Sequence, residues 1–549
     1  MAGWLQVAAV IALVGALHVP LGDYMARVFT ARRHWRAETV IYRLGGMDPD
    51  TDQPWPHYIR SLLATSVAGI VGLYLLLRLQ GHLPYSLGHP GMSPALAFDT
   101  AVSFTTNTSW QNYAGESTLG YLAQAAGLGV EAFLSAAVGL AAVLALIRGI
   151  VRRETDRVGN FWVDLTRAVI RVLLPLAAGF AVLLAGLGVI ENLGNWQVVT
   201  TLAGGRQAIP GGLVASWEPI KLISGDGGGF FNANSAHPFE NPGPLTNVIE
   251  ITLMLLVPVA CIRMFGRLAG DRRQGWALLA VAGVLFTAWM AITIAAESQA
   301  SGTAPAAAHA AMEGKQTAFG VPGSAAFGVA ATSSADGAAN ASYDSFTALG
   351  GGMLLSAMLL GEVSPGGVGS GLYGLLMVAV IGVFLGGLMI SRTPEYLRKR
   401  IRAPEMRMVA LYYLATPLVL LAGTAVAIAL PAGRAAILNP GAHGLSEVLY
   451  AFTSSANSNG SAFGGLSGNT TFYNTLLAVV MLLGRYAPMV FVLGLAGSLA
   501  RQRPTSGGAG TLRTSQPAFV ALLIGVAVVL VFLTFLPALA LGPLAEGLH

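Results

Sequence analysis

Long apolar runs alternate with polar segments along the whole chain. Each run is close to the ~20 residues that an α-helix needs to cross the hydrocarbon core of a bilayer. The runs occupy residues 4–22, 60–79, 125–147, 168–190, 246–265, 276–296, 370–390, 408–430, 473–499 and 517–540. This pattern predicts an all-α polytopic membrane protein with about ten transmembrane helices.

A second pattern recurs in four connections. An apolar stretch too short to span is followed by a cluster of glycine or small polar residues, and then by a long apolar run. The stretches and their clusters are Pro94–Thr105 with Thr106–Gln111, Gly212–Ser224 with Gly225–Asn232, Ser345–Leu360 with Gly361–Gly369, and Leu445–Thr453 with Ser454–Ser461. Repetition of one supersecondary unit is typical of a repeat architecture. We therefore expect four fused helix–pore-loop–helix repeats with one extra helix at each end.

The repeats divide the chain into six parts. These are 1–59 (first helix and basic loop), 60–147, 168–265, 276–390 and 408–499 (repeats one to four), and 517–549 (last helix and tail). Within the third repeat, residues 300–342 are rich in Ala, Gly and Ser. We expect them to form a mobile outer loop or cap, and we assign them no chemistry.

The repeated unit has a direct physical meaning. A half-helix that ends at mid-membrane presents the partial negative charge of its last carbonyls to the centre. Four such ends favour a monovalent cation, and the small residues that follow let the backbone line a filter with carbonyls. The predicted ion-binding residues are Thr106, Asn107, Thr108 and Ser109 in the first loop, Gly227, Gly228 and Gly229 in the second, Ser364, Pro365, Gly366 and Gly367 in the third, and Asn457, Ser458, Asn459 and Gly460 in the fourth, with Gln111 beside the first.

Composition excludes a soluble protein. Of the 549 residues, 54% are hydrophobic and 10% are charged, whereas soluble domains average about 25% charged residues. The pI near 9.3 does not indicate nucleic-acid binding, because most of the 31 basic residues lie in alternate connections. Such asymmetry marks the cytoplasmic side and places both termini outside. The single cysteine, Cys261, excludes an internal disulfide.

Two charged residues fall at membrane depth. Glu362 directly follows the third short stretch, and Arg485 lies inside an apolar run of the fourth repeat. Ionised groups at this depth are generally paired or functional. We favour an internal charge pair near the pore or its exit path, and the alternative is that both side chains snorkel to the interfaces.

Other polar residues near the loops have two interpretations each. Asp226 and Glu116 either attract cations at the outer mouth or are solvated loop charges. His237 and Glu240 lack a third ligand at a metal-binding spacing, so a structural turn is the better interpretation. The glycines of 370–390 either permit close helix packing or mark a bend or break.

The loop sequences resemble a known family. Segments Thr106–Gln111, Gly227–Pro242, Ser364–Leu372 and Asn459–Phe463 resemble the potassium-channel-like A subunit of the bacterial Kdp potassium-importing ATPase, and the resemblance covers essentially the whole chain. Ser109 stands where asparagine is expected, which puts in doubt the fine selectivity of that loop alone.

The resemblance implies a role and partners. It implies a multi-pass protein of the bacterial inner membrane that selects external potassium, the transported ion, and passes it through an intramembrane tunnel. It also implies three partners in the surrounding lipid: a P-type ATPase B subunit, a single-span C subunit and a small accessory peptide. The positions of Glu362 and Arg485 are charged in this family.

Two other function classes are alternatives. A stand-alone potassium channel or cation symporter of the Trk/Ktr type shares the four-loop architecture, but the extra terminal helices and the second-loop motif favour the pump subunit. A membrane enzyme would need a catalytic cluster at membrane depth, and the sequence offers none. The sequence also lacks a phosphate-binding loop and an Asp-Lys-Thr-Gly-Thr motif, so we expect this chain to bind no nucleotide and to have no catalytic site of its own.

Overall fold

The computed structural model describes residues 2–299, 307, 309–361, 363–389, 393–505 and 513–548. Among these, ten helices or merged helical segments are long and apolar enough to cross a membrane. They are Gly3–Thr30, Trp55–His82, Ala123–Val151, Phe161–Gly186, Pro244–Leu268, Arg272–Glu297, Ser370–Met389, Ala403–Ala429, Thr471–Ala500 and Pro517–Leu544. The predicted fold class, an all-α polytopic membrane protein, is confirmed.

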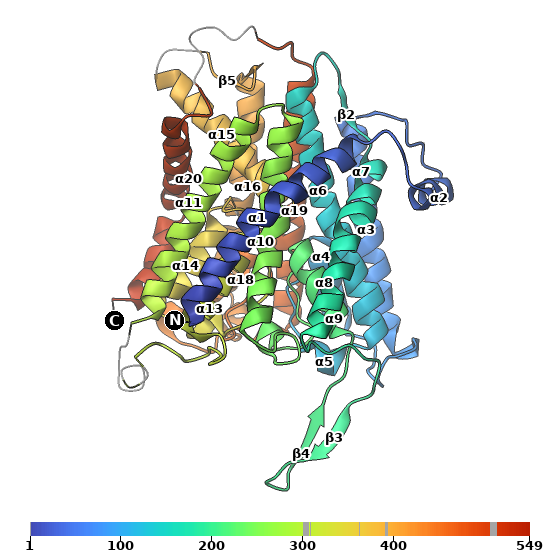
Figure 1. Cartoon of the computed structure of the whole chain (residues 1–549). Helices are drawn as coiled ribbons and strands as arrows, with labels where there is room; N and C mark the ends of the chain where they lie inside the picture. The colour runs from blue at the N-terminus through green and yellow to red at the C-terminus, as the bar shows by residue number, and fades with distance from the viewer. Residues whose placement is uncertain are drawn as a thin grey trace.

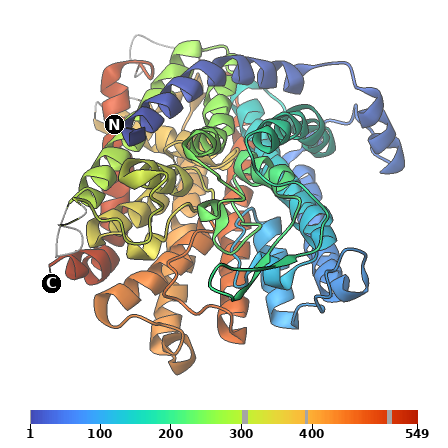
Figure 2. The same ribbon diagram turned by 60° about the horizontal axis from the view of Figure 1, so that its bottom comes forward.

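Four units of two long helices and a short one make up most of the bundle. The first unit holds α3 (Trp55–Leu79), α4 (Pro94–Thr105) and α6 (Gly129–Val151), and the fourth holds α16 (Ala403–Ala429), α18 (Gly441–Ala456) and α19 (Thr471–Ala500). In the second unit, α7 (Phe161–Arg167) and α8 (Leu174–Gly186) make up one long helix, which is followed by α9 (Val214–Ser224) and α10 (Pro244–Leu268). The third unit holds α11 (Arg272–Glu297) and α13 (Gly320–Ser333), and its second long helix is divided into α14 (Ala348–Leu359) and α15 (Ser370–Met389). The colours of Figure 2 pass in chain order around the centre, so the units enclose a common axis.

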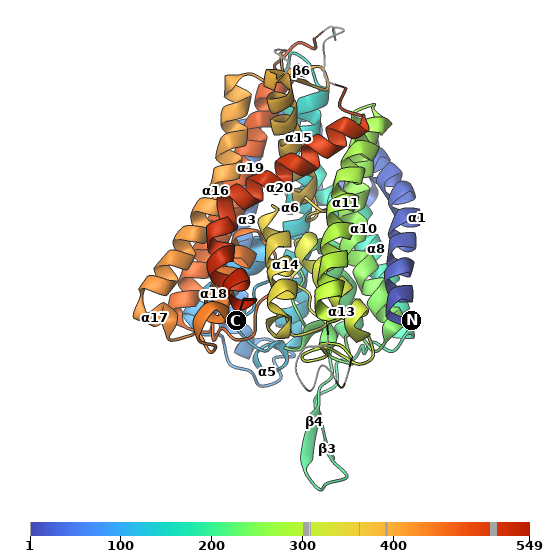
Figure 3. The same cartoon turned by 90° about the vertical axis from the view of Figure 1, so that its left-hand side faces the viewer.

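Two further helices flank the bundle. The first, α1 (Ala2–Thr30), packs along α10, and the last, α20 (Pro517–Leu539), packs on α11 and α15. Figure 3 shows α20 crossing the bundle obliquely. Both termini lie at the end of the molecule where the short helices begin (Figure 1).

Shorter elements complete the connections. The short helices and helical turns are α2 (Arg36–Leu44), η1 (Gln80–His82), α5 (Gly115–Thr118), η2 (Ala123–Leu128), η3 (Ala168–Leu173), η4 (Asn234–Ala236), η5 (Tyr343–Ser345), α17 (Pro431–Arg434) and η6 (Ala540–Leu544). Three antiparallel pairs join β1 (Gln53–Pro54) to β2 (Arg157–Gly159), β3 (Gln197–Thr200) to β4 (Arg206–Ile209), and β5 (Glu395–Tyr396) to β6 (Lys399–Arg400). The β3–β4 hairpin projects from the end that carries the termini, and β2 and β5 lie at the opposite end (Figure 1).

Close helix packing in the bundle depends on small residues. A Cβ added at Gly149 of α6 would lie 2.5 Å from the Ala496 carbonyl of α19. Helices in a membrane approach closely where such small residues face each other, because lipid provides no hydrophobic force to drive them together. The two helices can therefore pack backbone to backbone near their C-terminal ends.

The third repeat differs from the prediction. Residues 300–342 were expected to be a mobile loop or cap without chemistry, but Gly320–Ser333 form the buried helix α13. Its Ala- and Gly-rich sequence resembles a loop, yet the same small residues allow α13 to pack against α1, α10, α11 and α14. Residues 300–306 and 308 lie outside the described residues.

The predicted third short stretch, Ser345–Leu360, also has a different place in the structure than the sequence predicted. It contains α14, which together with α15 forms the second helix of the third repeat, interrupted at 360–369. The break therefore precedes Ser370, and α15 itself runs without interruption to Met389.

Candidate ion-binding site

The four short helices α4, α9, α13 and α18 end in the same way. In each, a backbone N–H donates to the carbonyl five residues earlier: Thr108 to Ser103 (2.9 Å), Asp226 to Lys221 (3.0 Å), Asp336 to Ala331 (3.0 Å) and Asn459 to Ser454 (2.9 Å). This bond belongs to a helix C-cap in which the preceding residue is left-handed. The four loops are therefore structurally equivalent, whatever their sequences.

The caps require left-handed residues at matching positions. These are Asn107 (φ 60°), Gly225 (φ 64°), Ala335 (φ 56°) and Ser458 (φ 59°). Two residues later, Ser109 (φ 52°), Gly227 (φ 81°) and Gly460 (φ 98°) are left-handed again. Positive φ is uncommon outside glycine. Alternating handedness can align successive peptide groups on one side of the chain, and an aligned row of carbonyls can replace the hydration shell of a cation.

The loops close into a ring in the order of the chain. The Asn107 side chain donates to the Gly225 carbonyl (3.1 Å), which joins loops one and two. A Cβ added at Gly227 would collide with the Gly337 nitrogen, which joins loops two and three. One at Gly337 would lie 2.8 Å from the Asn459 carbonyl oxygen, which joins loops three and four.

A fourth contact completes the circle. A Cβ added at Gly460 would collide with the carbonyl of Thr108 in loop one. At the contacts of Gly227, Gly337 and Gly460 the backbones approach more closely than ordinary side chains allow. The glycines therefore set the width of the ring.

The structure brings together the predicted residues of the first, second and fourth loops. In the second loop, the ring includes Ser224 to Gly227, and Gly227 is equivalent to Ser109 and Gly460. Gly228 and Gly229 lie further out, where the Gly229 N–H donates to Gln111 Oε1 (2.9 Å). The first-loop side chain of Gln111 thus positions the outer part of the second loop.

The predicted third-loop residues Ser364, Pro365, Gly366 and Gly367 do not occupy the third quarter of the ring. That place belongs to 334–337, after α13. The predicted segment lies in the interruption between α14 and α15, where the Gly366 N–H donates to the Ser333 carbonyl (2.8 Å). It therefore packs against the inner end of the third loop.

Sequence reasoning missed the segment Ser334–Gly337, although a signal was present. The Asp226–Gly227 pair of the second loop recurs as Asp336–Gly337, in both cases after a serine and a small residue. Comparison of short motifs would have placed the third loop there, whereas comparison of apolar stretches did not.

Two carboxylates of the ring are buried. Asp226 is 1% exposed and Asp336 is fully buried, and one oxygen of each has no hydrogen-bond partner among the described residues. Asp226 therefore lies inside the protein, and neither the predicted outer mouth nor a solvated loop describes its position. Unpaired buried oxygen is costly unless a partner arrives, so the pair favours a cation at the ring.

A buried ion cluster supports the second loop from behind. Lys221 of α9 contacts Glu218 (2.9 Å) and Glu240 (2.8 Å), and all three are buried. Glu240 also accepts from the Phe231 N–H (2.6 Å). His237 stacks on Phe231 with ring centroids 4.1 Å apart, and burial lowers the pKa of His237. Both residues predicted to form a structural turn therefore make contacts that hold the loop.

Arg485 is buried in α19 beside the first loop. Its guanidinium donates to Asn107 Oδ1 and to the Ser135 carbonyl, both at 3.3 Å. The predicted partner, Glu362, lies outside the described residues, so the charge pair stays a prediction. What the structure shows is a positive charge held at the residue that caps α4.

An outer vestibule leads to the ring. The cavity measures about 820 Å³ and is lined by residues of all four loops, among them Gly227, Gly337 and Gly460. Gln111 lies on its wall with Asn232 and Asn234. Glu116 binds the Asn232 N–H at 2.8 Å and so fixes the rim.

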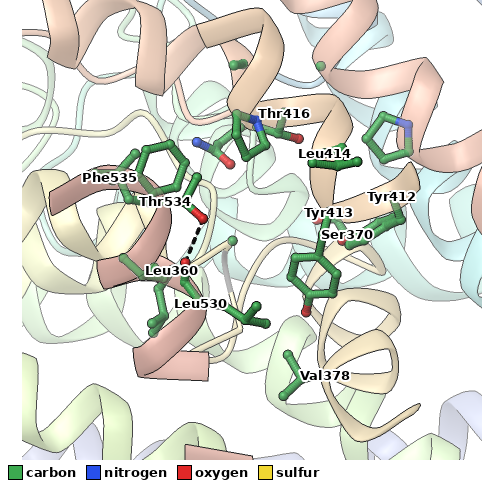
Figure 4. Close-up of a pocket in the computed structure, with 18 of the residues that line it drawn as sticks. Leu360, Ser370, Val378, Tyr412, Tyr413, Leu414, Thr416, Leu530, Thr534 and Phe535 are labelled. Carbon is green, nitrogen blue, oxygen red and sulfur yellow. Dashed lines mark hydrogen bonds between the residues drawn. The ribbon is translucent and has the colours of Figure 1, made fainter. Parts of the chain in front are cut away.

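A second cavity of about 230 Å³ lies on the other side of the fourth loop. Asn457 and Ser458 reach it from α18, Arg485 from α19, and Leu360 and Gly361 from the break before α15. Figure 4 shows Thr534 and Phe535 of α20 facing Ser370, Tyr412 and Tyr413 across it. The Tyr413 hydroxyl has no hydrogen-bond partner among the described residues. The cavity thus offers polar groups deep in the bundle.

Comparison with known proteins identifies the family. Residues 8–548 match the family described as "Potassium-transporting ATPase A subunit". The chain belongs to this family. A family relative from Kineococcus radiotolerans, named "Potassium-transporting ATPase potassium-binding subunit", is 56% identical over 547 residues, covering 100% of this chain and 98% of the relative. The relative of the same name from Mycolicibacterium smegmatis is 55% identical over 551 residues, covering 100% and 99%.

The fold of this family member is shared more widely. The crystal structure of the potassium transporter TrkH from Vibrio parahaemolyticus matches with a TM-score of 0.53 and 14% identity, over 89% of this chain and 97% of that one. At that identity the likeness shows the fold alone. The four-repeat architecture predicted from the sequence is therefore that of a potassium-transporter fold.

Proposed function

We propose that this chain is the potassium-binding subunit of an ATP-driven potassium importer. The observation that carries the proposal is the closed ring of four equivalent loops at the base of an outer vestibule. Four half-helix ends give the ring partial negative charge, and the buried carboxyl groups of Asp226 and Asp336 lie beside them, which favours a cation. The relatives' printed name specifies potassium.

Potassium is the substrate, and the backbone is the proposed ligand. Carbonyls of residues 106–109, 224–227, 334–337 and 457–460 are placed to replace water around the ion. The side chains of Asn107 and Asn459 bind the neighbouring loops, to the Gly225 carbonyl (3.1 Å) and the Ala331 carbonyl (3.0 Å), respectively. They hold the ring together, and the proposed ligands are the loop carbonyls that these side chains do not occupy.

The proposed path turns sideways below the ring. The inner cavity opens beside the break between α14 and α15, and Arg485 places a positive charge at the inner end of the first loop. A fixed positive charge repels a cation that continues along the axis. The cavity, which combines a few polar groups with a mostly apolar lining, is the proposed start of the tunnel that delivers potassium to a partner P-type ATPase B subunit. A single-span C subunit and a small accessory peptide complete the proposed complex, and the chain binds no nucleotide.

Reconstitution tests the proposal. Liposomes that contain this chain with its P-type ATPase subunit should accumulate potassium when ATP is supplied, and liposomes that contain the chain alone should not. Potassium-stimulated ATP hydrolysis by the isolated chain would disprove the assignment. Uphill uptake by the chain alone, driven by a proton or sodium gradient, would instead establish a Trk/Ktr-type symporter.

The orientation of the chain in the membrane can be tested separately. The basic connections lie at one end of the bundle and both termini at the other, so we propose an inner-membrane protein with both termini outside. A reporter active outside the cytoplasm, fused after Leu548, should be active. Activity from a cytoplasmic reporter at the same position would overturn this topology.

A further inference from the structure

A histidine and three carboxylates meet at the outer end of the fourth short helix. His443 and Glu447 lie one turn apart on α18, Asp344 comes from η5 in the third repeat, and Glu546 comes from the C-terminal tail. The group joins three segments that are far apart in the sequence. It lies outside the ring and takes no part in the proposed ion path.

The distances place three ligand atoms together. His443 Nε2 lies 3.0 Å from Asp344 Oδ1 and 4.0 Å from Glu447 Oε1. One ligand atom from each residue falls within 4.8 Å of the other two. Ligands at about 2.0–2.1 Å from a tetrahedral metal ion lie about 3.4 Å apart, so small side-chain movements would complete a site.

Two further features indicate a metal ion. Glu447 is fully buried; its Oε1 accepts from the Asn439 side chain, and its Oε2 has no hydrogen-bond partner among the described residues. The second ring nitrogen of His443, Nδ1, lies 2.9 Å from Glu546 Oε1. A carboxylate that accepts from the remote nitrogen is how metal-binding histidines are usually oriented.

We propose that Asp344, His443 and Glu447 bind a divalent cation of the zinc type, with Glu546 as the orienting carboxylate. An imidazole and two carboxylates suit zinc and similar transition metals better than calcium or magnesium, which prefer oxygen ligands alone. Asp344, His443 and Glu546 are partly exposed, so the ion can enter from the outer solution, and water completes its coordination.

The site is connected to the fourth pore loop. The His443 ring stacks on Phe463 with centroids 5.9 Å apart, and Phe463 stacks on Tyr450 at 4.2 Å. The Tyr450 hydroxyl contacts Ser461 Oγ (2.8 Å), one residue beyond the ring residue Gly460. A bound ion would therefore fix the outer end of α18 and the segment that leaves the fourth loop.

Without a metal ion the same residues form a charged clamp. Hydrogen bonds to Asp344 and Glu546 raise the pKa of His443 to about 10. The alternative to the proposal is that the clamp is permanently an imidazolium held by carboxylates. The two arrangements differ in what they bind, which makes them separable by experiment.

Zinc binding by the full chain provides the test. The protein is purified in detergent without a polyhistidine tag and dialysed against a chelator, and zinc binding is followed by titration calorimetry and by metal analysis. We expect one equivalent bound. His443→Gln and Glu447→Gln should weaken binding about 100-fold, and Glu546→Gln about 10-fold, as outer carboxylates typically do. Zinc should raise the melting temperature of the wild type and leave that of His443→Gln unchanged.

A matched control is His82→Gln, which removes an exposed histidine elsewhere in the chain. It should bind zinc as the wild type does. Absence of stoichiometric binding in the wild type, or equal losses in His443→Gln and His82→Gln, would overturn the proposal and leave the imidazolium clamp. Neither result would affect the assignment of potassium binding to the ring.

Discussion

At the scale of single residues, the ring depends on glycines, which have no side chain to separate the loops. Gly337 faces the Asn459 carbonyl of the next loop, where a Cβ would lie at 2.8 Å. A contact that short forces one backbone to move. The residue was not among those predicted from the sequence, and it offers the sharpest test of the corrected third loop.

We expect Gly337→Ala to weaken apparent potassium affinity in uptake assays about tenfold, which corresponds to about 1.4 kcal/mol. The cause is displacement of loop four away from loop three. Uptake at low external potassium by the assembled transporter measures the change.

The control is Gly464→Ala, on the wall of the same vestibule, where a Cβ would meet open space. It should leave the affinity unchanged. If Gly337→Ala also leaves it unchanged while the protein stays folded, the third loop does not contact the ion.

Lys221 permits a stability prediction. Lys221→Met leaves Glu218 and Glu240 buried without their cation, and removal of one partner from a buried pair typically costs about 3–5 kcal/mol. We expect a lower melting temperature in detergent. Arg503→Met is the comparison, because that side chain is 85% exposed in its pair with Glu154 and such surface pairs contribute below about 1 kcal/mol. Equal shifts in the two variants would contradict this account.

At the scale of elements, the sequence predicted most of the bundle and misplaced one quarter of the site. The ten spans were predicted correctly because uninterrupted apolar runs of this length have one structural solution in lipid. Loops one and four followed from small polar residues placed directly after short apolar stretches. Helix α13 was missed because alanine and glycine pack a buried helix and also make flexible loops.

The backbone conformation of the ring could not be predicted from the sequence. Ala335 adopts φ 56°, a conformation that alanine does not favour. Neighbouring loops impose it, and a single sequence carries no record of such tertiary constraints. The glycines of 370–390, by contrast, do not break the helix: α15 is continuous from Ser370 to Met389, which favours the close-packing interpretation.

The break before α15 gives an element-scale prediction. A Cβ on Gly369 (φ 84°) would collide with the Gly139 carbonyl of α6. Gly369→Ala should therefore displace the segment below the ring and lower the maximal rate of uptake about tenfold, with little change in apparent affinity, since a loss in rate without a loss in binding marks a later step.

Gly270→Ala is the matched control for this variant. Gly270, between α10 and α11, is also left-handed (φ 71°), but a Cβ there meets open space, so the change introduces the strain without the collision and should leave the rate unchanged. A loss of affinity equal to the loss of rate in Gly369→Ala would contradict the proposed path.

At the scale of the whole molecule, the β3–β4 hairpin stands apart from the bundle (Figure 1). Its strands pair with each other from Gln197 with Ile209 to Thr200 with Arg206, and their side chains are largely exposed. We expect replacement of residues 198–208 by two glycines to change stability by less than about 0.5 kcal/mol, as exposed changes usually do. Melting temperature and potassium uptake measure the outcome. Lost uptake with unchanged melting would give the hairpin a functional role.

The interruption between α14 and α15 makes one of the four repeats different from the other three. The corresponding helices α6, α10 and α19 continue through 23, 25 and 30 residues. In a channel built from four copies of one subunit, any break would be copied four times and would open on four sides. A chain that joins four unequal quarters can carry one such break. On the proposed path a single lateral opening meets a single neighbour, so the fusion of the repeats predicts a one-to-one ratio of this chain to the ATPase subunit proposed to receive the ion.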